Sequence, residues 1–165
     1  MAMRMVRDVT GAGSAWSDPA RWEEVKQPDG CPICKRGVPL DVIADLGATW
    51  VTAAAQAPLP GYACVVSKRH AVEPFHLPAV ELAAFWNEAM AVACALCDLF
   101  EPTKMNYEIH GNTIPHLHMH LFPRFAGDPY VGVPIDSRSS FFTRSHDDLK
   151  RLREALAATP RADGQ

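Results

Sequence analysis

Pro115-His-Leu-His-Met-His-Leu-Phe-Pro-Arg124 decides the fold, because histidine occupies every second position from His116 through His118 to His120. Side chains alternate between the two faces of an extended strand. If this run is a strand, the three imidazoles share one face and the apolar residues between them share the other. Imidazoles in a hydrophobic core would each need a hydrogen-bond partner. The pattern therefore predicts a strand with an apolar face against a helix and a chemical site on its histidine face.

The segments around this strand predict an α+β fold. Runs of β-forming residues at 42–44, 49–53, 62–66 and 106–110, together with 115–123, give an antiparallel sheet of about five strands. The segment 78–100 has the apolar spacing of a long helix, with Pro78 at its start and Pro102 beyond its end. A second amphipathic helix is expected at 146–158. Because strands precede and follow one long helix, we expect a single domain with that helix packed on the sheet.

The chain divides into three parts on this interpretation. Residues 1–28 form an N-terminal arm that is partly flexible, with a short helix expected to begin at Asp18-Pro19. Residues 29–128 form the core domain, and residues 129–165 form a C-terminal extension with a helix.

Composition sets the class of protein. The 165 residues are 48% hydrophobic and 21% charged with a net charge of −3, which is ordinary for a globular domain and argues against a nucleic-acid partner. The first eight residues lack the apolar stretch of a secretory signal, and charged or polar residues interrupt the apolar segment 77–100. We therefore expect a cytoplasmic protein with no membrane segment.

Four of the five cysteines fall in two Cys-x-x-Cys pairs. Cys31 and Cys34 have the spacing of a structural zinc site, which needs two further ligands; the alternative is a free dithiol in a turn. Cys94 and Cys97 lie inside the long predicted helix, where we expect small buried residues. A site built from all four thiolates remains the rival for a metal. His76, His110 and His146 are expected to be surface or hydrogen-bonded histidines.

The run from His116 to Phe122 resembles the signature of the histidine triad (HIT) superfamily of nucleotide hydrolases and transferases. The similarity extends to Gly111-Asn-Thr-Ile-Pro-His116 before the run, to Pro123-Arg124 after it, and to Ser67-Lys-Arg-His70, which follows the turn at Pro60-Gly61. It covers about residues 30–128.

This resemblance implies a site and a chemistry. His118 would be the nucleophile that takes up the nucleotidyl group, since a neutral imidazole can attack phosphorus near pH 7. His120 would contact the phosphate, and Asn112 and Thr113 would bond phosphate oxygens or help the leaving group. Asn106 is a weaker candidate for the same pocket, and a strand-end asparagine with no role is about as good an interpretation.

The zinc-containing, bacterial-type branch of the superfamily implies the missing metal ligands. In it, two histidines complete the cysteine site, and their positions match His70 and His116. Zinc on Cys31, Cys34, His70 and His116 would be structural and would brace the strand that aims His118. No organic cofactor is implied.

The substrates implied are nucleoside phosphoramidates and dinucleoside polyphosphates such as diadenosine tetraphosphate, cleaved at a phosphoramidate or phosphoanhydride bond. The superfamily also implies a homodimer formed through the long helix and the adjoining strand. One departure is that residues 50–58 lack the acid or asparagine that holds the ribose in many members, so Thr52 or Gln56 would have to substitute.

Two other functions stay open. One is a zinc-stabilised nucleotide-binding or adaptor protein with little turnover. The other is a metalloenzyme in which His116, His118 and His120 all bind one catalytic metal.

Overall fold

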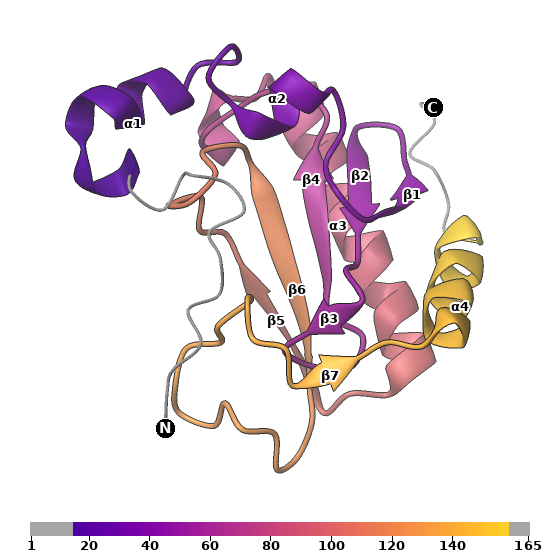
Figure 1. Cartoon of the computed structure of the whole chain (residues 1–165). Helices are drawn as coiled ribbons and strands as arrows, with labels where there is room; N and C mark the ends of the chain where they lie inside the picture. Colours follow the sequence, from indigo (N-terminus) through magenta and orange to yellow (C-terminus); the bar gives the residue numbers. More distant parts are fainter. Residues whose placement is uncertain (1–14, 159–165) are drawn as a thin grey trace, which may run out of the picture.

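The computed structural model describes residues 15–158, shown with their helices and strands in Figure 1. The helices are α1 Pro19–Val25, α2 Pro32–Arg36, α3 Ala79–Phe100 and α4 His146–Ala157, with short 3-10 turns η1 Ala15–Ser17 and η2 Pro74–His76. The strands are β1 Val42–Asp45, β2 Thr49–Thr52, β3 Gln56–Ala57, β4 Ala63–Ser67, β5 Lys104–Glu108, β6 His118–Arg124 and β7 Phe142–Thr143. The rest of the predicted arm, residues 1–14, and residues 159–165 lie outside this range.

Five strands form one antiparallel sheet in the order β1-β2-β4-β6-β5. The predicted α+β class, the five-stranded antiparallel sheet and the single long helix are confirmed. The histidine strand β6 lies between β4 and β5, and Cys64 of β4 and Glu108 of β5 are both paired with His120. Because directly paired residues point to the same face of an antiparallel sheet, this register decides which side chains surround the histidines.

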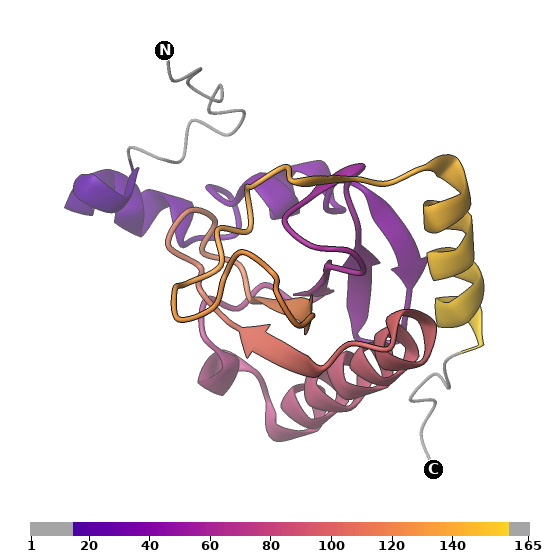
Figure 2. The ribbon, with the colours of Figure 1, turned by 90° about the horizontal axis from the view of Figure 1, so that it is seen from below.

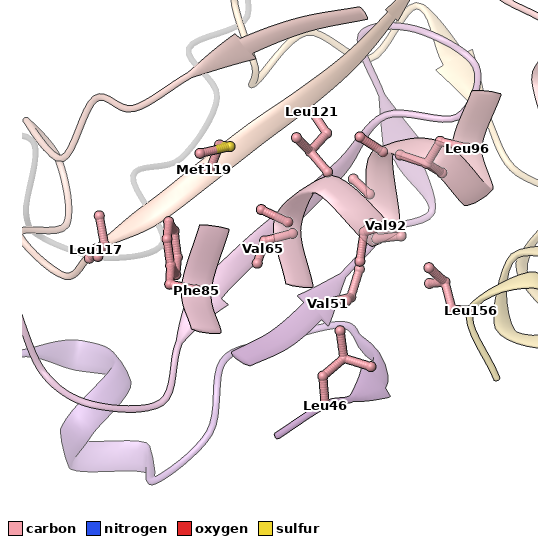
Figure 3. Close-up of a cluster of buried hydrophobic side chains, with 14 of the residues drawn as sticks. Leu46, Val51, Val65, Phe85, Val92, Leu96, Leu117, Met119, Leu121 and Leu156 are labelled. Atoms are coloured by element: carbon pink, nitrogen blue, oxygen red, sulfur yellow. The ribbon is translucent and has the colours of Figure 1, made fainter. Parts of the chain in front are cut away.

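The main hydrophobic core lies between one face of the sheet and α3 (Figures 2 and 3). The apolar side of β6 supplies Met119 and Leu121, and α3 supplies Phe85, Val92 and Leu96. By length and composition α3 could cross a membrane. Here, however, one of its sides packs against the sheet, as in the core helix of a globular domain.

Local signals explain where α1 and α4 begin and why the turn before β4 contains a glycine. Asp18 caps α1 by accepting hydrogen bonds from the amides of Ala20 and Arg21. At α4, Ser145 and Asp148 form a reciprocal capping box. The turn before β4 needs glycine at Gly61, where φ is 73° and an added Cβ would lie 2.6 Å from a ring carbon of Phe100.

The chain after β6 returns to the core domain on the side of the sheet away from α3 (Figure 2). There, Tyr130 and Ile135 form a small buried cluster with Leu59 and Phe122. The chain then pairs with the segment after β2 through the two-residue strands β3 and β7. This part of the chain therefore covers one end of the histidine face.

Candidate functional site

Cys31, Cys34, His70 and His116 come together from three separate parts of the chain. The cysteines lie at the start of α2, His70 follows β4, and His116 comes just before β6. Their ligand atoms all lie within 4.8 Å of one another. The Nδ1 atom of His116 is 3.4 Å from Cys31 Sγ, 3.6 Å from Cys34 Sγ and 3.4 Å from His70 Nδ1. A tetrahedral zinc ion with ordinary Zn–S and Zn–N bonds would separate its ligands by about 3.5 Å. The geometry therefore fits a Cys2His2 zinc site.

Backbone carbonyls orient both imidazoles of this cluster. His70 Nε2 donates to Lys26 O at 2.8 Å, and His116 Nε2 donates to Ser67 O at 2.8 Å. A carbonyl only accepts, so the proton lies on Nε2 and the Nδ1 lone pair is free for a cation. Burial lowers the pKa of His116, which favours the neutral ring that a metal requires. Burial, with the neighbouring Cys31, raises the pKa of the Cys34 thiol to about 11, so metal binding must displace a proton there.

Cys94 and Cys97 are not part of this cluster. Among the described residues, the group able to hold a metal includes two cysteines, Cys31 and Cys34. Cys94 and Cys97 lie on α3, which covers the other face of the sheet. Cys97 is half-buried and Cys94 is exposed, so the expectation that both are core residues is wrong for Cys94. Cys94 directly follows buried Ala93, and one residue along a helix turns a side chain by about 100°. The interpretation as an all-thiolate site is not supported.

His116 precedes the strand rather than beginning it. Its amide donates to Ile114 O at 2.8 Å, a tight turn, and β6 starts only at His118. Its ring faces the cysteines, and neither His118 nor His120 belongs to the group of described residues that could bind a metal. The three histidines therefore do not converge on one metal in this structure.

His118 is held by the backbone of His116. Its Nδ1 lies 2.6 Å from His116 O, so Nδ1 carries the proton and donates it. Nε2 is then the nitrogen with the free lone pair. Burial lowers the pKa of His118, which keeps this half-buried ring neutral and nucleophilic near pH 7.

His120 lies next to His118, with ring centroids 4.9 Å apart and planes at 83°. Its Nδ1 is 2.8 Å from the hydroxyl of Tyr62, and its ring stacks at 5.8 Å on Phe122. Burial and the two neighbouring imidazoles His118 and His110 lower the pKa of His120 to about 3, so the ring is neutral at pH 7. Sequence reasoning missed Tyr62. The tyrosine comes just before β4, and only the β4–β6 register brings it to His120.

The C-terminal segment fixes the backbone of Tyr62. Buried Arg144, directly after β7, donates to the carbonyl oxygens of Tyr62 and Ala54. The same segment binds Gln56, whose side-chain oxygen accepts from Thr143 at 3.2 Å. Gln56 is thus engaged with β7. Thr52, the other residue considered for the ribose, is paired with Cys64 and lies on the same face of the sheet as His120.

The remaining predicted site residues lie on β5 and in the loop that follows it. Asn106 is half-buried and paired with Phe122, which places it on the histidine face. Asn112 and Thr113 are exposed in the loop between β5 and β6. Glu108 and His110, which sequence reasoning did not select, form a pair on the same face, and His110 lies beside His120.

The HIT domain family matches residues 36–127, more than half of the chain. This chain belongs to the HIT domain family. The matched range includes His118 and His120, and it begins after the two cysteines of the metal cluster.

Solved structures of HIT proteins share this fold. A histidine triad protein from Bradyrhizobium japonicum is 27% identical, with a TM-score of 0.64 over 72% of this chain and 88% of that one. A Zn-bound histidine triad family protein from Mycobacterium smegmatis is 22% identical, with a TM-score of 0.58 over 79% of this chain and 96% of that one. A third, from Marinobacter aquaeolei, is 21% identical, with a TM-score of 0.63 over 72% of this chain and 90% of that one. No curated protein matches the sequence.

Proposed function

We propose that this HIT protein is a nucleotidyl hydrolase or transferase that works through a covalent nucleotidyl-His118 intermediate. The observation that carries the proposal is the 2.6 Å hydrogen bond from His118 Nδ1 to His116 O, which leaves Nε2 as the nucleophilic nitrogen. Membership of the family, a superfamily of nucleotide-binding hydrolases and transferases, supports the choice of a nucleotide as substrate.

The reaction consists of two displacements at phosphorus. In the first, His118 Nε2 forms a P–N bond while the bond from phosphorus to the leaving oxygen or nitrogen breaks. In the second, water or phosphate attacks the same phosphorus, the P–N bond breaks, and the electron pair returns to Nε2. Charge on the non-bridging oxygens must be stabilised in both steps.

Neutral donors beside His118 suit this task. If the Tyr62 hydroxyl donates to Nδ1 of His120, then His120 Nε2–H is free to donate to a phosphate oxygen. Asn112 and Thr113 are the donors proposed for the phosphate or the leaving group, with Asn106 a further candidate on the histidine face. Thr52 is the better placed of the two candidates for the ribose, because Gln56 is bound to Thr143.

We also propose that Cys31, Cys34, His70 and His116 hold a structural zinc ion. Such an ion would cross-link α2, the chain after β4 and the chain before β6. A Zn-bound relative of the same fold supports this assignment. Five free cysteines agree with a reducing compartment, and we propose a cytoplasmic location.

A trapping experiment tests the nucleophile. Diadenosine tetraphosphate or adenosine 5′-phosphoramidate, radiolabelled at the adenylyl phosphorus, is mixed with excess enzyme and quenched with alkali. We expect a protein-bound label that is stable in alkali and lost in acid, as a P–N bond should be, and that maps to His118 by mass spectrometry. His118→Ala should lose the label and turnover, whereas the matched control His146→Ala, on α4, should keep both.

The same variants address the adaptor alternative. The His118→Ala protein should still bind nucleotide, because His118 contributes the bond-forming atom rather than most of the contact surface. Equal turnover by wild type and His118→Ala would refute the enzyme and favour the adaptor.

A homodimer is proposed through β5 and the outer side of α3. β5 is an edge strand of the described sheet, and such edges readily pair with another chain. Trp86 and Met90 are each 40% exposed one helical turn apart on α3, and Tyr107 of β5 is 44% exposed. Such an apolar surface next to a free edge suits a second copy of this chain. Light scattering should give a dimer mass for wild type and a monomer mass for Trp86→Glu.

A further inference from the structure

A carboxylate–imidazole pair lies beside His120, whose ring neighbours the proposed nucleophile His118. Glu108 is paired with His120 across β5 and β6, so both side chains lie on the histidine face. His110 Nε2 is 2.8 Å from Glu108 Oε2, and the His110 ring centroid is 5.4 Å from that of His120. The three imidazoles of His110, His120 and His118 thus follow one another along this face.

The second nitrogen of His110 is available for chemistry. A carboxylate accepts only, so Nε2 carries a proton and Glu108 orients the ring. Among the described residues, Nδ1 has no hydrogen-bond partner, and the His110 side chain is 49% exposed, so a bound molecule can reach it. His110 also interacts electrostatically with the two β6 imidazoles, since it contributes to lowering the pKa values of His118 and His120.

The proposed reaction needs a proton that the other imidazoles do not offer. The leaving atom departs with the electron pair of the broken bond and must be protonated unless it is very weakly basic. His118 commits its Nδ1 proton to His116 O, and the low pKa of His120 leaves that ring without an acidic proton near neutral pH. Among the described residues, His110 is the remaining imidazole on this face, and its Nε2 is held by Glu108 Oε2 at 2.8 Å.

We propose that His110, oriented by Glu108, is the general acid and base of the reaction; this inference rests on the proposed function. In the first step, charged His110 gives its Nδ1 proton to the leaving oxygen or nitrogen as the P–N bond to His118 forms. In the second step, neutral His110 takes a proton from the attacking water as the P–N bond breaks. Each cycle returns both rings to their starting protonation states.

The groups facing His110 are Glu108, the last residue of β5, and His118 and His120 on β6. Glu108→Gln removes the carboxylate that orients the His110 ring, so it should slow the steps that use His110.

Leaving groups of different basicity provide the test. Two adenosine 5′-phosphate derivatives are compared in single-turnover reactions of the full chain: a p-nitrophenyl ester, whose leaving group needs no proton, and an alkyl phosphoramidate, whose amine does. His110→Gln should form the His118 adduct from the p-nitrophenyl ester within about threefold of the wild-type rate. It should lose roughly 100-fold or more with the phosphoramidate, the usual size of a general-acid contribution.

Controls separate this role from a structural one and from failure of the proposed function. His146→Gln should match wild type with both substrates, and circular dichroism checks that each variant is folded. Equal losses with both substrates, or no loss with either, would overturn the role of His110. If wild type forms no adduct on His118 with either substrate, the proposed function itself fails, which is a different result.

Discussion

Asp128 should stabilise the start of the C-terminal segment in a manner that depends on pH. Its carboxylate accepts two hydrogen bonds from Arg124, at 2.7 and 2.8 Å, and further bonds from the amides of Phe125 and Tyr130. The Asp128 side chain is only 4% exposed, so water screens these interactions little. The hydrogen bond to Arg124 is the main reason that the pKa of Asp128 falls from 3.8 to about 2.

The pKa gives the size and sign of the effect. Because the pKa is lower in the folded protein than in the unfolded chain, the ionised group favours folding. A fall from 3.8 to about 2 corresponds to about 2 kcal/mol of unfolding free energy at neutral pH. This contribution is complete above about pH 5 and is lost as the pH falls through 4 towards 2. Asp128→Asn should therefore cost about 2 kcal/mol at pH 7 and progressively less in acid.

Urea unfolding of the two proteins at several pH values measures this difference. Comparing them at the same pH removes effects they share, including any release of metal from the cysteine cluster in acid. Asp136→Asn is the matched control, because Asp136 pairs with Arg138 at an exposed position and should cost less than about 0.5 kcal/mol. A cost for Asp128→Asn that stays the same from pH 7 to pH 3 would refute the electrostatic explanation.

Three further predictions concern the site and its support. Tyr62→Phe removes the hydroxyl 2.8 Å from His120 Nδ1, so kcat should fall about tenfold with little change in the unfolding midpoint, as steady-state kinetics and thermal unfolding will show. Cys31→Ser should reduce zinc from one ion per chain to none and lower the melting temperature, whereas the exposed Cys94→Ser should change neither; metal analysis of purified protein measures this. Gly61→Ala should cost more than about 2 kcal/mol in urea unfolding, because its φ is positive and a ring occupies the space of the new methyl group; a neutral result would contradict that packing.

The sequence was most informative where a pattern repeats over many residues. The period of two around His118 and Met119 predicted β6, and the helical spacing across 78–100 predicted α3. The same reasoning could not reach α2, which has five residues, or β3 and β7, which have two each. Elements this short contain little more than one period, too little for a repeating pattern to be recognised, and they form because the rest of the chain brings their partners together.

In the site, too, the residues that belong to a sequence motif were predicted, whereas the residues that only strand register brings together were not. The set Cys31, Cys34, His70 and His116 was anticipated through the family resemblance, and the distances agree with it. The tight turn at His116 was not anticipated, since alternation alone suggests a strand that continues through it. Tyr62 and Glu108 were missed because their relation to His120 depends on strand register, which short-range pattern does not specify.

His116 links the two halves of the site, because its ring and its backbone do different work. The His116 ring lies beside the cysteines, and its Nε2 donates a hydrogen bond to Ser67 O. The backbone carbonyl of His116 accepts the hydrogen bond from His118 Nδ1. A ligand on the ring would limit rotation of the peptide that carries this carbonyl. The carbonyl in turn fixes which nitrogen of His118 is nucleophilic and where it points. Loss of the cluster should therefore reduce the rate of adduct formation before it reduces nucleotide binding, because it disturbs the aim of one ring rather than the shape of the pocket.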